Sequence, residues 1–443
     1  MKEQFIVENE EFFKTFLEST FFDNWRNSTR DSMKHHNYSS IEFSLGYACD
    51  LSCSYCYYTR YGKELYGKKS IKKENVLSNV EKVMKFIVKN NMLVNIEIFA
   101  GEIFVISYIW DIFDIILKHE AMLPVEKRPF AIIAPSNMSF LKEGREEIFD
   151  KFAEYRQRFA ELDIFFGISA SVDGPFLDND NRPSKTKKPY TKEFYEKLIS
   201  YGTEFDYGYH PMIYSTGIEH WIDNYLWFAQ NIQTNLYLLE VRNAEWNTKQ
   251  SKQLYYFMKF LVHKIFKDSG ENHDSFLEFL GKRGTNIIES TYSTIGRGIG
   301  CSLQSTLQLN MNELSLSSCH RLAYDYLQAG TFDFHEDGGY DFNPGNVEMY
   351  IATHAVDSKS MVPCDSCAIN ELCSAGCLGA NLEATGDAFI NPPTMCAMEH
   401  AKILGIFEAF EEIGIVDRIY SMVPIRKASQ IKNLLKMAKK EIA

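Results

Sequence analysis

Short apolar runs alternate with longer stretches of helical periodicity between about residues 40 and 270. The apolar runs are rich in β-branched and aromatic residues, as strands are. The longer stretches carry an apolar stripe with a charged flank, which Val76, Val80, Val83 and Ile87 illustrate. The expected strands are Ile41–Leu45, Val94–Phe99, Phe130–Ala134, Ile164–Val172, Tyr207–Tyr214 and Leu236–Val241. The expected helices lie near 73–90, 106–119, 142–160, 191–203, 218–232 and 249–268.

Six such repeats predict a parallel sheet with helices on its outside, because parallel neighbours need a crossover connection. A closed barrel of this kind uses eight units in about 250 residues. The pattern therefore predicts an α/β fold, a partial (β/α)6 TIM barrel that stays open, over residues 41–270. Residues 1–40 form an extension ahead of it, and residues 271–300 form a bridging region behind it.

The pattern changes after residue 300. Thr306–Leu309 and Leu314–Leu316 predict a hairpin around Met311–Glu313, and a Cys/Gly/Pro-rich segment of little periodicity follows at 364–396. Such a segment needs crosslinks to fold stably, and bound metal clusters can provide them. We therefore expect a small cysteine-rich auxiliary-cluster domain at 301–400. Residues 401–443 continue a helix predicted at Met398–Ile413 and end in a basic tail that is expected to pack on the surface. The tail's apolar stripe consists of Ile431, Leu434, Leu435, Ala438 and Ile442.

Composition narrows the setting. The chain has 443 residues and a net charge of −12, which argues against nucleic acid or an anionic membrane surface as a partner. No segment approaches the roughly 18 uninterrupted apolar residues of a membrane helix. The mixed, acidic start Met1–Glu10 lacks the basic and apolar regions of a secretory signal. We expect a cytoplasmic protein.

The ten cysteines are unevenly distributed. Three lie between Cys49 and Cys56, none lies between Cys56 and Cys301, and seven lie between Cys301 and Cys396. Because the cytosol keeps thiols reduced, clustered cysteines there indicate metal ligands or catalytic groups before disulfides.

Cys49, Cys53 and Cys56 form a C-x3-C-x2-C motif directly after the first expected strand. The four irons of a cubane iron–sulfur cluster are usually each bound by a thiolate. Three neighbouring cysteines would thus leave the fourth iron open to a chelating ligand. A zinc site is the alternative, but zinc usually takes four ligands from paired motifs, and no second pair lies nearby.

The segment Phe43–Tyr58, FSLGYACDLSCSYCYY, resembles the signature of the radical S-adenosylmethionine (SAM) superfamily. Phe99-Ala100-Gly101-Glu102 resembles the family's glycine–glycine–glutamate motif, with alanine at the first glycine. The ends of the third and fourth strands also resemble family segments that contact the cofactor. A plain structural role is the alternative for Asn137 and Arg182. The resemblance implies cofactor contacts for Tyr55, Gly101, Glu102, Asn137, Ser171 and Arg182.

This resemblance implies a specific chemistry. An external electron donor of the flavodoxin or ferredoxin type reduces a [4Fe-4S] cluster bound to SAM. Homolysis then gives a 5′-deoxyadenosyl radical, which removes hydrogen from an unreactive C–H bond. The protein's part is to hold the cofactor and exclude water and oxygen.

The later cysteines resemble the SPASM extension of radical SAM peptide-modifying enzymes, down to the x2, x5 and x3 spacings of Cys364, Cys367, Cys373 and Cys377. A zinc ribbon is the alternative. Where the family often has glycine five residues before its second cysteine, this chain has Leu314, so the hairpin turn must differ, with Asn312 as a candidate. The family's ligand order implies two further [4Fe-4S] clusters, three in all. One would use Cys364, Cys367, Cys373 and Cys396; the other would use Cys301, Cys319 and Cys377 only, leaving an iron for water, another side chain or substrate.

Three functions compete. The first is a maturase that installs a thioether or carbon–carbon crosslink in a ribosomally made precursor peptide. The second is formylglycine formation, as in the anaerobic sulfatase-maturing enzymes, which carry a catalytic aspartate directly after the cysteine that matches Cys319. His320 stands there instead and could accept a proton; a supporting hydrogen bond to a neighbouring ligand is the alternative. The third, a non-enzymatic iron–sulfur electron carrier, has no need of a SAM-binding barrel. We favour the peptide maturase.

Many peptide maturases begin with a leader-binding domain of roughly 80 residues, whereas about 40 precede the first strand here. Leader recognition is therefore expected to involve a separate leader-binding protein, the flank of the barrel, or no leader at all.

Overall fold

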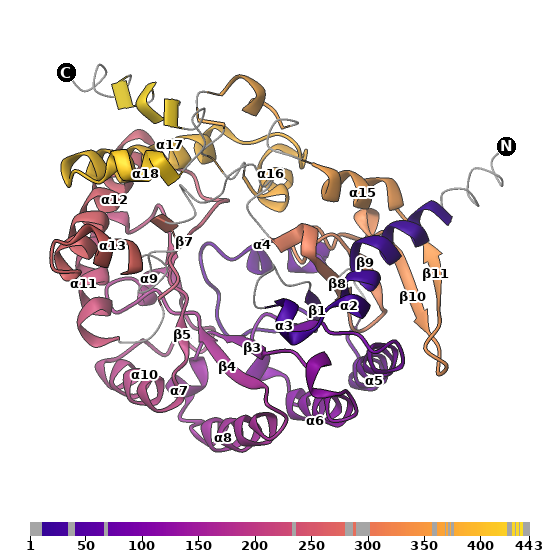
Figure 1. The fold of residues 1–443 in the computed structure, drawn as a ribbon. Helices are drawn as coiled ribbons and strands as arrows, with labels where there is room; N and C mark the ends of the chain where they lie inside the picture. Colours follow the sequence, from indigo (N-terminus) through magenta and orange to yellow (C-terminus); the bar gives the residue numbers. More distant parts are fainter. Residues whose placement is uncertain are drawn as a thin grey trace.

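The computed structural model describes most of the chain. Its main feature is one continuous, curved sheet of nine strands in the order β11-β10-β9-β8-β1-β2-β3-β4-β5 (Figure 1). The strands are β1 (Ser40–Ser44), β2 (Asn95–Phe99), β3 (Ala131–Ser136), β4 (Phe165–Ala170), β5 (Gly208–Tyr209), β8 (Thr306–Asn310), β9 (Ser315–Ser317), β10 (Gly330–Phe334) and β11 (Tyr340–Pro344). The described residues are 11–33, 40–65, 70–232, 236–279, 287–288, 302–356, 361–367, 369–370, 373, 376–422, 428–429, 431–433 and 435–436.

Strands β1 to β5 run parallel in chain order, as the repeats predict. Helices lie outside them (Figure 1). In α5 the predicted stripe Val76, Val80, Val83 and Ile87 is fully buried. The helices that follow the strands are α4 (Tyr57–Leu65), α5 (Lys73–Lys89), α6 (Ile109–Glu120), α7 (Ser139–Glu143), α8 (Glu147–Ala160), α10 (Lys192–Phe205), α11 (Trp221–Asn231) and α12 (Thr248–Asp268).

Two predicted elements are each divided in two. The helix expected at 142–160 is interrupted at Gly144, whose φ of +72° ends α7 before α8 begins. The expected strand Tyr207–Tyr214 is broken at His210–Pro211 into β5 and β6 (Met212–Ile213). Proline has no N–H to donate to a ladder, which explains the break. The last of the six expected strands corresponds to β7 (Leu239–Glu240), which pairs with β6.

The predicted C-terminal hairpin exists, but it belongs to the barrel sheet. β8 pairs in parallel with β1 over its whole length, and β9, β10 and β11 follow it antiparallel. The proposal that Asn312 supplies the unusual turn conformation is wrong. Leu314 itself takes a left-handed φ of +55° while its side chain is buried; Asn312 instead accepts a hydrogen bond of 2.9 Å from the backbone N–H of Lys72.

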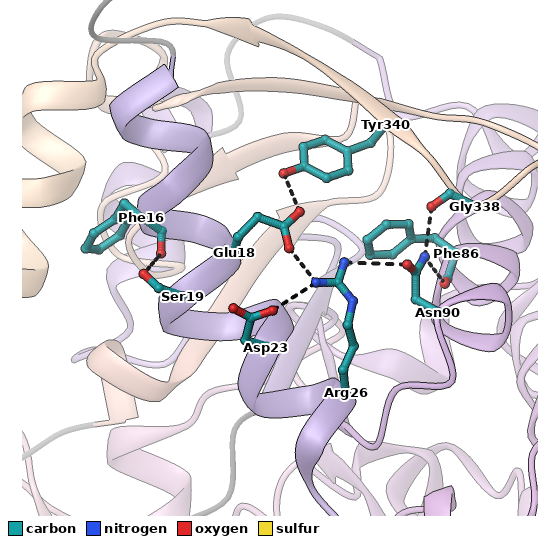
Figure 2. A network of polar contacts seen from close by, with 9 residues as sticks. All are labelled: Phe16, Glu18, Ser19, Asp23, Arg26, Phe86, Asn90, Gly338 and Tyr340. Carbon is teal, nitrogen blue, oxygen red and sulfur yellow. Dashed lines mark hydrogen bonds and ion pairs between the residues drawn. The ribbon is translucent and has the colours of Figure 1, made fainter.

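The N-terminal segment connects the hairpin of β10 and β11 to the rest of the barrel. The helices η1 (Glu18–Phe22) and α2 (Asp23–Asn27) bury an apolar face of Phe21, Phe22 and Trp25. Figure 2 shows their polar side, where Arg26 donates to Glu18 and Asp23, and the hydroxyl of Tyr340 from β11 donates to Glu18 over 3.1 Å. Asn90, at the end of α5, donates to the carbonyl of Gly338 beside β11 over 2.8 Å. A third short helix, α3 (Arg30–Met33), follows.

The C-terminal helices close the other side of the barrel. The predicted helix Met398–Ile413 is part of α17 (Pro393–Glu412), which packs along α12. Lys402 of α17 and Glu240 of β7 form a buried ion pair there. Of the tail stripe, Ile431 and Leu435 are buried, while Leu434, Ala438 and Ile442 lie outside the described residues. The other helices of this half are α13 (His273–Phe279), α15 (Val347–Ala355), α16 (Leu378–Thr385) and α18 (Val416–Met422). In the described part of the chain, none of the helices combines the length and apolarity needed to span a bilayer.

Candidate functional site

The first cysteine motif occupies the loop between β1 and α4, at the carboxyl end of the parallel strands. This loop lies directly against the end of β2: the backbone N–H of Glu102 donates to the carbonyl of Ala48 over 2.8 Å. A Cβ added at Gly101 would lie 2.5 Å from that same oxygen. Glycine is required at Gly101 because two backbone segments meet there.

The thiols of this loop are sheltered. Burial raises the pKa of Cys49 and of Cys53 to about 12, so both are protonated in the absence of a metal. Thiolates are what iron binds, and metal binding therefore displaces these protons. Cys56 is half-buried at the start of α4.

The side chain of Glu102 connects backbone and side-chain groups at the ends of β2 and β3. Its buried carboxylate accepts hydrogen bonds from the backbone N–H groups of Asn137 (2.6 Å) and Phe104 (3.1 Å) and from the hydroxyl of Ser136 (2.9 Å). Burial raises its pKa to about 7 against these bonds. The structure thus places Glu102 as the link between the ends of β2 and β3.

Asn137 lies closer to the cysteines. Its amide donates to Asp50 Oδ1 over 3.1 Å and points at the sulfur of Cys49 from 3.5 Å. Ser171, at the end of β4, is half-buried, and its backbone N–H donates to the carbonyl of Ser136 over 2.7 Å. These residues therefore bring the ends of β3 and β4 to the first cysteine.

Tyr55 and Arg182 meet over Asp173. The hydroxyl of Tyr55 donates to Asp173 Oδ2 over 2.8 Å, and the Arg182 guanidinium lies 3.8 Å from the same oxygen and over the Tyr55 ring. Arg182 is 5% exposed, and within the described residues its Nε and Nη1 have no hydrogen-bond acceptor. A buried cation with unused donors fits an anionic ligand group, such as a carboxylate.

Asp173 is the residue that the sequence analysis missed as the centre of this group. Besides Tyr55 and Arg182, it accepts a hydrogen bond of 3.0 Å from the backbone N–H of Met212. Burial raises its pKa against the opposing charge of Arg182. Asp178 accepts a hydrogen bond of 2.8 Å from the backbone N–H of Asp173. Burial and the neighbouring charge of Asp173 raise the pKa of Asp178 to about 7. The position of Asp173 directly after the expected strand Ile164–Val172 was the available signal.

The second cysteine group also gathers in space. Cys364, Cys367, Cys373 and Cys396 line one small cavity. The Asn391 amide donates to the sulfur of Cys364 over 2.9 Å. Burial raises the pKa of Cys396 to about 11. These are the four residues that the family's ligand order places on one cluster.

The remaining cysteines are less fully placed. Cys319 lies just after β9, and Cys377 precedes α16; the Arg321 guanidinium, paired with Glu383, approaches the sulfur of Cys377 to 3.9 Å. Cys301 lies outside the described residues. The structure therefore leaves the three-cysteine ligand set an expectation.

His320 lies on the inner wall of the barrel. Its Nδ1 is 2.8 Å from Glu42 Oε2 on β1, and its ring stacks on Phe99 of β2 with centroids 4.2 Å apart. Within the described residues, its polar contact is with Glu42 and not with Tyr55 or Arg182. The structure thus places His320 among the strands, against the β2 residue that lies two positions before Gly101.

The arrangement of these donors decides which kind of metal centre they suit. Within the described residues, no three His, Cys, Asp or Glu side chains are arranged around a single ion. A cubane cluster makes a different demand, because each of its thiolate ligands binds a different iron. The three cysteines of the first loop and the four around the small cavity are all buried or half-buried, and each group meets that demand in kind.

A larger cavity of about 670 Å³ lies between the barrel and the C-terminal part. The ends of β6 and β7 supply Tyr214 and Arg242, and α4 supplies Arg60. Tyr214 also packs edge-on against Tyr55. The cavity thus adjoins the group around Asp173.

No protein-family description matches this chain, and no curated protein matches it either. Solved structures do resemble it. Hexahistidine-tagged anSMEcpe with bound AdoMet aligns over 84% of this chain and 98% of its own, at 16% identity and a TM-score of 0.58. Native anSMEcpe with AdoMet and the Cp18Cys peptide aligns over 89% and 99%, at 16% identity and a TM-score of 0.55. Streptococcus suis SuiB bound to S-adenosylmethionine reaches a TM-score of 0.46 at 12% identity, over 82% and 80%.

The anSMEcpe enzyme is an anaerobic sulfatase-maturating radical SAM/SPASM enzyme. The chain therefore has the fold of the radical SAM enzymes that carry a SPASM extension, and the predicted partial barrel is confirmed. At this identity, the likeness establishes the fold.

Proposed function

We propose that the protein is a radical SAM enzyme that modifies a peptide. The observation that carries this proposal is the juxtaposition at the barrel's carboxyl end. Three thiols lie on one loop there, beside a buried arginine whose Nε and Nη1 have no acceptor among the described residues. When bound, a [4Fe-4S] cluster and SAM would supply a 5′-deoxyadenosyl radical. An external donor of the flavodoxin or ferredoxin type would supply the electron.

The chain's own residues then have distinct tasks. Cys49, Cys53 and Cys56 would hold the cluster, and Arg182 would pair with the cofactor's carboxylate. Gly101 lets the cysteine loop and β2 approach each other, and Glu102 fixes the loop after β3 by its hydrogen bonds. Asp173 orients both Tyr55 and Arg182. The buried surroundings keep water from the reactive centre.

Two observations support a peptide as substrate. The large cavity that adjoins Tyr55 offers amide and hydroxyl groups as well as charges, which suit a peptide main chain; Asn243, Asn247 and Thr394 are examples. Structures of anSMEcpe, which share this fold, hold the Cp18Cys or Kp18Cys peptide. The second cysteine group would hold one fully ligated auxiliary cluster, and the Cys301, Cys319 and Cys377 set would hold the other.

Crosslink formation is the preferred reaction. Formylglycine formation is the second candidate, favoured by the fold shared with anSMEcpe. His320 bears against it, because this position carries an aspartate base in the enzymes of that group. A mass spectrum separates the two after anaerobic incubation with SAM, a reductant and a peptide encoded beside the gene. Loss of two hydrogens without a new aldehyde supports a crosslink; a new aldehyde at cysteine or serine, detected by the added mass of its hydrazone with a hydrazine reagent, supports the second reaction.

The matched variants are Cys53→Ala and Ser54→Ala, which alter neighbouring residues of one loop. Only the first should abolish modification. A peptide left unmodified by the wild-type protein, while SAM is consumed, would contradict the peptide assignment.

A further inference from the structure

Three polar side chains stand side by side on the inner face of the sheet. Gln308 of β8, Glu42 of β1 and Glu97 of β2 are in register on adjacent parallel strands. Residues in register project from the same face. The alternating residues Phe43, Ile96 and Ile98 are apolar and fully buried, as on the face that the helices cover, so the polar face lies inside the barrel. We call Gln308, Glu42 and Glu97 the inner row.

The inner row has hydrogen-bonding capacity that the described residues do not use. Gln308 is fully buried, and neither atom of its amide has a partner among them. Glu42 is 4% exposed; one carboxylate oxygen faces His320, and the other has no partner among the described residues. Buried polar groups are nearly always hydrogen-bonded, so a partner for this row has to come from beyond the described side chains.

The inner row is accessible to solvent at one end and contains two carboxyl groups. Glu97 is exposed to solvent, although surrounding protein raises its pKa by desolvation against a hydrogen bond from Ser40. The next residue in register, Ile133 of β3, is 38% exposed. Among the described residues, neither Glu42 nor Glu97 forms an ion pair with a lysine or arginine.

We propose that the inner row binds a basic side chain, lysine or arginine, of the peptide substrate. Its aliphatic stem would lie along Ile133, and its head would donate to Glu97, the free oxygen of Glu42 and the amide oxygen of Gln308. Basic side chains combine an apolar stem with several N–H donors, which matches this sequence of surfaces. A row rich in acceptors and negative charge selects against an acidic or purely apolar residue. This inference rests on the proposed function and specifies its substrate.

The probes are acetyl-Gly-Lys-Gly-amide and its arginine analogue, with acetyl-Gly-norleucine-Gly-amide as the uncharged match. Binding to the anaerobically reconstituted protein is measured by NMR titration. We expect a basic peptide to bind about tenfold or more tightly than the norleucine peptide, as a charge-assisted hydrogen bond provides. Glu97→Gln should remove about tenfold of that preference. The control Glu161→Gln, at an exposed residue directly after α8 on the outside of the barrel, should leave it unchanged. Equal binding of all three peptides would overturn the inference.

Gln308→Leu separates binding from a purely structural role. If Gln308 contacts the substrate, the variant binds the basic peptide more weakly. If the row is merely filled by water, the variant melts at a higher temperature and binds the peptide unchanged, which would refute the inference. SAM cleavage measured on the same samples tests the proposed function separately. If SAM is cleaved but basic peptides bind no more tightly than the norleucine peptide, only the substrate assignment is wrong. If basic peptides bind more tightly but SAM is not cleaved, only the proposed function is wrong.

Discussion

Gly101→Ala tests how closely the cysteine loop must approach β2. The new methyl group would lie 2.5 Å from the carbonyl oxygen of Ala48 and 2.6 Å from that of Tyr47. Ordinary contact begins near 3.4 Å, so one backbone segment has to move by about 0.9 Å. Both neighbours are backbone, and no side-chain rotation relieves the clash.

Two consequences follow from this displacement. Overpacking of this size costs roughly 1–3 kcal/mol of folding stability. A shift of about 1 Å in a reacting group costs on the order of 10²-fold in rate. We therefore expect a moderate loss of thermal stability but a loss of about 100-fold in 5′-deoxyadenosine formation, with a lower iron content per chain.

The control is Gly144→Ala. Gly144 has a left-handed φ of +72° and open space around its Cβ position, so alanine strains only the backbone, by about 1–2 kcal/mol. It should lose comparable stability and keep its iron and its rate of SAM cleavage. If Gly101→Ala retained native iron content and native cleavage, the close approach would not matter to the site.

Three further changes test the physical reasoning. Leu314→Gly should have a free energy of unfolding about 1 kcal/mol higher than that of Leu314→Ala in a denaturant titration, because the left-handed φ of +55° penalises alanine. The reverse order would contradict the turn assignment. Lys402→Met should destabilise the fold by about 3 kcal/mol in urea, since it removes one of the two cations beside the buried Glu240 and Glu399 and leaves Arg242 alone to balance them. A change below about 1 kcal/mol would show that the pair is solvated. Glu120 is fully buried, and burial raises its pKa to about 8 against the influence of Arg128, so folding favours its protonated form. The unfolded state then binds fewer protons than the folded state between about pH 4.5 and 8, and stability falls with rising pH in that window. Glu120→Gln should flatten that fall, and an unchanged slope in urea titrations at about pH 5, 6.5 and 8 would refute it.

Local pattern accounts for most of the barrel. The stripe of α5 and the apolar runs at β1 to β4 are short-range signals, and they predicted elements at the right positions. The break at His210–Pro211 was also readable, because proline cannot pair in the middle of a sheet. The pairing of β8 with β1 was not, since the two strands are 266 positions apart and no local pattern encodes a partner.

The candidate site divides in the same way. Cysteine spacing identified the residues of the first loop and those around the small cavity, because ligand spacing is local. The role of Asp173 as the centre of Tyr55 and Arg182 depends on a fold that brings three segments together. The Leu314 conformation was missed because a buried leucine carries no turn signal of its own. The inner row was missed because Gln308, Glu42 and Glu97 come from three separate segments.

The central claim is that three thiols of one loop hold a cluster at which SAM is cleaved. The most direct measurement is anaerobic reconstitution with iron and sulfide, followed by reduction in the presence of SAM and quantitation of 5′-deoxyadenosine. The account predicts a protein that binds iron and sulfide and forms 5′-deoxyadenosine, and a Cys53→Ala variant that forms none while Ser54→Ala still does. A wild-type protein that carries iron and sulfide but leaves SAM intact, or a Cys53→Ala variant that cleaves it at the native rate, would contradict the account.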